Sequence, residues 1–341
     1  MELLRTSLTD KNYKDDRIFL GISKFNFNKV AKEFELKLKE SFPSDCYINF
    51  DNNIKTLKVD YQKQELLKRY WNTFKNKEVT FGYYDGEINL IQINNNYIFN
   101  RKKLEKIANH ELIHMASAKN KFQVGFVQKL PLSTNNSAVF GKMFNEGYTE
   151  YLNQKYFCGV IPGSCYTSYY HEMMIAAGVK RIIGEDLMNK LYFNADLIGL
   201  IKELSKYSDI DSILEVFVRT DLAVTKKSVD LKLAEYKKVR SIISDMYLNK
   251  LNDEFVFGNI SEDEYARNKF LNYDMYNRYA RVYSDSTRVI EIGPKYIIHD
   301  GYKKDVVGKN LSSYKFKVDK AYFTNFLEKN INDDLKIKKA M

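Results

Sequence analysis

Hydrophobic positions recur with a helical period over several long stretches of the chain. Apolar residues at three- and four-residue spacing predict amphipathic helices at residues 25–42 and 101–120, the second with Asn100 as its N-cap. The same spacing predicts a helix at residues 62–74. A short strand is predicted at residues 47–51.

Between residues 79 and 99 the period changes to two, which is the alternation of a β-strand. Two such runs, 79–84 and 87–93, flank the turn dipeptide Asp85-Gly86 and predict a tight hairpin. A small sheet is therefore expected immediately before the helix at residues 101–120.

The chain beyond residue 120 is mostly helical in pattern. A strand at residues 122–130 and a loop at 131–137 are predicted to lead into a second helix at residues 137–156. Sequences typical of capping boxes begin at Ser212 and Ser261. Six further helices are predicted, at residues 168–183, 185–193, 196–207, 212–217, 232–251 and 262–283.

These elements predict an α+β fold that is predominantly helical. Short strands return at residues 288–293 and 295–301. We divide the chain into four parts, which are an N-terminal accessory region (1–79), a central region (80–160), a helical lobe (161–285) and a C-terminal mixed segment (286–341).

The composition, with 44% hydrophobic and 29% charged residues among 341, is ordinary for a globular protein. The formal net charge is +10, but Lys and Arg are spread along the chain among Asp and Glu. Because the sequence also lacks a nucleic-acid-binding motif, nucleic acid is not an expected partner. Three cysteines do not make a disulfide framework.

The chain begins without an apolar run long enough for a signal peptide, and no run approaches the length of a membrane span. The sequence therefore predicts a cytoplasmic protein without a membrane span. Export by a route that needs no cleaved signal stays open, and the oligomeric state is not indicated.

The most informative stretch is His110-Glu111-Leu-Ile-His114, an H-E-x-x-H motif inside the helix predicted at residues 101–120. Half of the four histidines in the chain fall in it. On a helix His110 and His114 share a face, where two imidazoles can bind one Zn²⁺. Glu111 stands beside that face and can act on a water at the metal. The alternative is a pair of structural histidines.

A second informative stretch, Asn145-Glu146-Gly147-Tyr148-Thr149-Glu150, lies in the helix predicted at residues 137–156. Glu146 and Glu150 are four residues apart at the edge of the apolar stripe, where like charges repel and burial is costly. A nearby metal ion with its ligand histidines would offset both the repulsion between the two carboxylates and the cost of burying them. The alternative is two solvated glutamates.

The two motifs together resemble the gluzincin metallopeptidases, and the fuller string resembles uncharacterised bacterial proteins with a minimal gluzincin core. The resemblance covers about residues 80–160 and implies a zincin-like metal-binding core, with the small sheet packed on the H-E-x-x-H helix. It implies that His110, His114 and Glu146 bind Zn²⁺, that Glu111 is the general base, and that Glu150 orients the first histidine. Glu150 stays open as an alternative to Glu146.

The resemblance further implies a zinc-dependent peptidase with a peptide or protein substrate. His171 is the tentative donor to the oxyanion, with a structural role in its helix as the alternative. A non-catalytic zinc-binding protein built on the same core is the main rival, and a basic nucleic-acid-associated protein is the third.

Overall fold

The structure is a computed structural model that describes residues 25–62, 82–94, 101–133, 136–163, 167, 169–226, 228–272, 289–292 and 295–298. The statements below concern these residues. The helix predicted at residues 62–74 lies outside them, apart from Gln62. Asn100, the predicted N-cap of the helix at residues 101–120, also lies outside them.

The described chain is mostly helical with small sheets, so the predicted α+β class is confirmed at that level. By its internal contacts the chain forms two compact units. The first unit takes the described parts of residues 1–128, 148–168 and 189–196, and the second takes those of residues 129–147, 169–188 and 197–341. Helix α6 (Lys142–Leu152) is continuous through one of these divisions.

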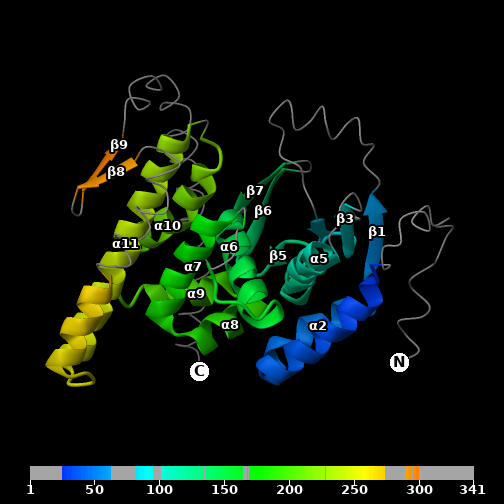
Figure 1. Ribbon diagram of the computed structural model, residues 1–341, viewed down its shortest axis with the longest axis horizontal. Helices are drawn as coiled ribbons and strands as arrows, with labels where there is room; N and C mark the ends of the chain where they lie inside the picture. The colour runs from blue at the N-terminus through cyan, green and yellow to red at the C-terminus, as the bar shows by residue number, and fades with distance from the viewer. Residues whose placement is uncertain are drawn as a thin grey trace. The chain divides into compact units, whose positions relative to one another are not determined.

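The first unit is organised around helix α5 (Arg101–Ala116), which packs against helix α2 (Phe27–Ser41) (Figure 1). Helix α2 starts where the Asn26 side chain accepts a hydrogen bond from the Lys29 amide at 3.0 Å. Its buried face has helical spacing and consists of Phe27, Val30, Ala31, Phe34 and Leu38. The helix predicted at residues 25–42 is therefore confirmed.

A three-stranded sheet also contacts α5. It has the order β1 (Lys58–Gln62), β3 (Leu90–Asn94), β2 (Gly82–Asp85), with β1 parallel and β2 antiparallel to β3. Strand β2 is thus an edge strand beside α5. The predicted hairpin is confirmed, although its turn is wider than the two-residue turn expected, because residues 86–89 all belong to it.

The strand predicted at residues 47–51 is wrong, because this segment forms helix α3 (Ile48–Asn53). Phe50 is fully buried there. The Asn53 side-chain amide donates to the carbonyl oxygens of Met115 at 3.0 Å and Ala118 at 2.7 Å, at the end of α5. These tertiary contacts favour the helix over the local alternation of polar and apolar residues.

A second sheet has the order β4 (Ala118–Asn120), β5 (Gln123–Val124), β6 (Val127–Ser133), β7 (Asn136–Phe140). The loop predicted at residues 131–137 and the helix start at residue 137 are therefore wrong. Residues 136–140 pair as a strand, and α6 begins only after Gly141, whose φ of 74° breaks the extended chain.

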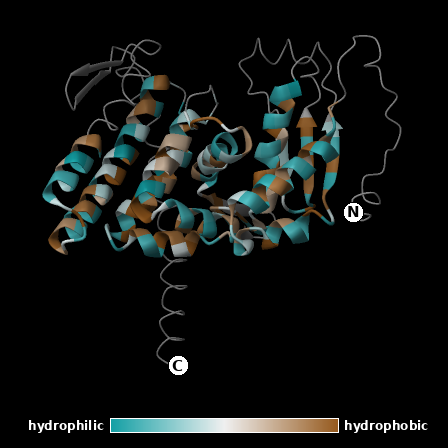
Figure 2. Cartoon of the chain, turned by 60° about the horizontal axis from the view of Figure 1, so that its bottom comes forward, coloured by the Kyte–Doolittle hydropathy of each residue, from teal (hydrophilic) through white to brown (hydrophobic). Residues whose placement is uncertain are grey.

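The second unit is mainly helical. Helix α11 (Val229–Val256) packs against both α7 (Tyr170–Ile183) and α10 (Ile210–Ala223), and α9 (Leu197–Leu204) contacts α7 and α10 (Figure 1). Figure 2 shows hydrophobic and hydrophilic residues alternating along the helices, as amphipathic packing requires. Helix α8 (Glu185–Phe193) follows α7 in the chain.

Two capping predictions had different outcomes. Asp209 rather than Ser212 caps α10, because its carboxylate accepts from the Ser212 amide at 2.8 Å. The Ser261 side chain does accept a hydrogen bond from the Glu264 amide, at 3.2 Å, and residues 262–272 are helical.

Near the end of the described chain, β8 (Val289–Ile292) and β9 (Lys295–Ile298) form an antiparallel pair. The short strands predicted in this part of the chain are therefore confirmed.

Candidate metal centre

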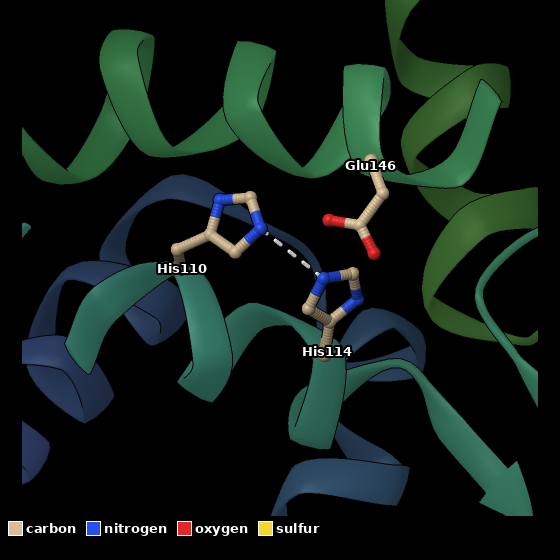
Figure 3. Close-up of side chains that lie close together, drawn as sticks. All are labelled: His110, His114 and Glu146. Atoms are coloured by element: carbon tan, nitrogen blue, oxygen red, sulfur yellow. Dashed lines mark hydrogen bonds between the residues drawn. The ribbon is translucent and has the colours of Figure 1, made fainter. Parts of the chain in front are cut away.

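Helix α5 presents the H-E-x-x-H side chains on a buried surface. His110, Glu111 and His114 are 8%, 6% and 7% exposed. The two histidines are one turn apart, and their Nε2 atoms lie 3.2 Å from each other (Figure 3). Each imidazole therefore directs the same nitrogen toward one point.

Glu146 on α6 completes the group. One ligand atom from each of His110, His114 and Glu146 lies within 4.8 Å of the others, and among the described residues these three could hold a metal ion. Figure 3 shows the Glu146 carboxylate directed toward the His114 ring. Glu146 is half-buried, and the group offers two imidazole nitrogens and one carboxylate oxygen as potential donors.

The spacing of the imidazole nitrogens fits zinc. Two nitrogens bound at about 2.0–2.1 Å in a tetrahedral arrangement are separated by roughly 3.3 Å, and the observed separation is 3.2 Å. Two histidines and one carboxylate also form a ligand set typical of catalytic zinc, which keeps one position for water or substrate. The residues present therefore fit a divalent metal ion of which zinc is one example.

Glu150 lies on the opposite side of the His110 ring from that point. Its Oε2 is 3.2 Å from His110 Nδ1, while its Oε1 accepts from Lys106 Nζ at 2.8 Å and from Gln154 Nε2 at 2.8 Å. The geometry thus groups Glu146, rather than Glu150, with the two Nε2 atoms. Glu150 holds the ring through its other nitrogen, as ligand histidines in metal sites are commonly held.

The surroundings of Glu150 favour its ionised form. Burial alone would raise the pKa of this carboxyl, but the hydrogen bonds and positive charges of His110 and Lys106 outweigh burial and lower the pKa to about 2. A carboxylate fixed in the charged state favours the Nδ1–H tautomer of His110, which leaves Nε2 free of hydrogen for a metal ion.

Sequence reasoning missed the residues that hold His114. Thr149 is fully buried on α6, and its Oγ1 lies 3.4 Å from His114 Nδ1 and 2.5 Å from the Tyr192 hydroxyl. Thr149 lies between Glu146 and Glu150 in sequence, but no sequence motif marks this threonine as a partner of a histidine. Only the fold brings Tyr192, from α8, to the same point.

The predicted end of this helix near residue 156 agrees with the structure, but the form of its last turn was not predicted. The helix continues into a π-helical turn, η4 (Asn153–Phe157), of the kind often found near functional sites. Asn153 donates to the Lys106 carbonyl at 3.0 Å, and Gln154 donates to Glu150. Asn153 therefore joins this turn to α5. Gln154 fixes Glu150, the residue that contacts His110.

The start of α6 is fixed by two contacts within the second unit. The Asp221 carboxylate of α10 accepts hydrogen bonds from the amides of Gly141 at 2.9 Å and Met143 at 2.7 Å, so it caps the helix. Gly147, next to Glu146, faces the backbone of α7, and a Cβ there would stand 2.2 Å from the Glu172 carbonyl carbon. The glycine of the Asn-Glu-Gly sequence thus permits close helix packing.

His171, the tentative oxyanion donor, lies near the start of α7 and is buried. Its ring stacks on the Tyr236 ring, with centroids 4.5 Å apart, and Tyr236 donates a short hydrogen bond to Glu172. Burial, together with the charge of Arg240, lowers the pKa of His171 to about 3, so the imidazole is neutral near pH 7. The role in oxyanion binding stays a prediction.

Comparisons with known proteins identify no relative: no family model, curated protein or solved structure matches the chain. The interpretation of the centre therefore depends on its residues and geometry.

Proposed function

We propose that the protein is a zinc-dependent peptidase in which His110, His114 and Glu146 hold the ion. The observation that carries the proposal is the convergence of two buried Nε2 atoms, 3.2 Å apart, with the Glu146 carboxylate in one potential metal group. Glu150 and Thr149 support it, because each stands at the Nδ1 atom of one of these histidines.

Bound Zn²⁺ would act as a Lewis acid and lower the pKa of a water molecule toward 7. The residues of this chain supply the rest of the chemistry. Glu111, next to a ligand histidine and buried, would accept the proton of the attacking water and pass it to the leaving amine. Glu150 would keep His110 oriented throughout, and Thr149 would do the same for His114.

Substitution Glu111→Gln tests this assignment, because it removes the base and keeps the shape of the side chain. We expect zinc content to stay at about one ion per chain and cleavage of a broad peptide library to fall by at least about 100-fold. Unchanged cleavage in Glu111→Gln, or a zinc-loaded wild type that cleaves no peptide, would refute the peptidase. The second result would favour the non-catalytic zinc protein.

A further inference from the structure

Gly82 is the first residue of edge strand β2, which passes beside helix α5. A Cβ atom built on Gly82 would stand 2.7 Å from Glu111 Oε1 and 2.6 Å from Ile107 Cγ2. Cβ atoms essentially never approach other heavy atoms so closely, so a side chain at position 82 must displace its neighbours. Gly82 does not have a positive φ, so its backbone conformation alone does not require glycine.

We propose that Gly82 is a positioning residue for Glu111, because the absence of its side chain leaves the space in which the carboxylate stands. The inference rests on the proposed function, in which Glu111 is the general base. Glu111 is only 6% exposed, so its side chain stands among protein atoms and not in open solvent. A general base must stay within hydrogen-bond reach of the water it deprotonates, and a shift of about 1 Å can cost about 100-fold in rate.

The contact itself can be measured in zinc-free protein by a double-mutant cycle of Gly82→Ala and Glu111→Ala. We expect Gly82→Ala to lower the midpoint of thermal unfolding in protein that has Glu111, and about half of that loss or more to disappear in the Glu111→Ala background. The contact with Ile107 is present in both backgrounds and cancels. An equal loss in both backgrounds would overturn the inference, whether or not the protein binds zinc.

The consequence for the reaction is tested with zinc-loaded protein. We expect Gly82→Ala to keep its zinc and its KM while kcat falls about 10- to 100-fold. A purely structural role would lower stability without lowering kcat at constant KM. An unchanged kcat would therefore contradict the inference. Failure of the proposed function is distinguishable, because it appears in the wild type as absence of zinc or of cleavage.

Gly86→Ala is the matched control. Gly86 follows β2 directly in the same hairpin, and a Cβ there would meet the Val124 Cγ2 methyl at 3.3 Å, not Glu111. At this distance the methyl group must move by only a few tenths of an ångström, less than the shift that a side chain at position 82 requires. We expect Gly86→Ala to leave kcat as in the wild type, and an equal fall in both variants would assign the effect to the hairpin and not to position 82.

Discussion

At the scale of residues, the centre depends on side chains that would bind no metal themselves. The Nε2 atoms of His110 and His114 lie 3.2 Å apart, so without an ion one of these nitrogens must carry a hydrogen and donate it to the other. Glu150 and Thr149 hold the rings in that arrangement from their Nδ1 atoms. A metal ion at this point would replace the hydrogen bond between the two rings and accept a lone pair from each Nε2.

Substitution Thr149→Val removes the hydroxyl that lies between His114 and Tyr192 and keeps the shape of the side chain. We expect zinc affinity to fall about 10-fold, since outer partners of ligand histidines typically contribute 10- to 100-fold. Titration against a competing chelator measures the change. Thr220→Val is the control, because Thr220 is equally buried but donates to the Val216 carbonyl within α10. Equal affinities in the two variants would contradict a role for Thr149.

At the scale of elements, helix α6 determines the centre as much as α5 does. It carries Glu146, Thr149 and Glu150 within a little more than one turn, and Asp221 caps its first turn. Because Gly147 has no side chain, the backbone of this helix can lie directly against the backbone of α7. A change at Gly147 should therefore act on Glu146, the adjacent residue.

We expect Gly147→Ala to destabilise the protein by about 1–3 kcal/mol through overpacking and to weaken zinc binding, because the added Cβ meets backbone that cannot rotate away. Chemical denaturation and chelator competition give the two values. Gly178→Ala is the comparison, since a Cβ there would meet the Ile243 side chain at 2.9 Å instead. A stable Gly147→Ala variant with wild-type zinc affinity would show that α6 does not need this close approach.

The elements also show which features a sequence can predict. The helical period located α2 and α5 to within a few residues. Helix α2 has one buried face, and α5 keeps the helical spacing at Leu104, Ala108 and Leu112 although its last two turns are buried on every side. It failed at residues 136–140, where Val139 and Phe140 fit a helix as well as a strand and pairing with β6 decides. Motif spacing identified His110, His114 and Glu146, but Tyr192 and Gly82 reach the centre only through the fold.

At the scale of the whole molecule, the described helices include none that is long and apolar enough to cross a membrane. The first unit contains both histidines on α5, and the continuous helix α6 carries both acidic residues of the centre. In the proposed function one ion is bound by side chains from two helices, and the four strands of the second sheet lie between these helices in the sequence.

The position of that ion is the most direct test. Crystals of protein purified with zinc, measured on both sides of the zinc absorption edge, should show one anomalous peak at about 2.0–2.1 Å from the Nε2 atoms of His110 and His114 and within bonding distance of the Glu146 carboxylate. A peak at another set of residues, or no peak in protein saturated with zinc, would contradict the account.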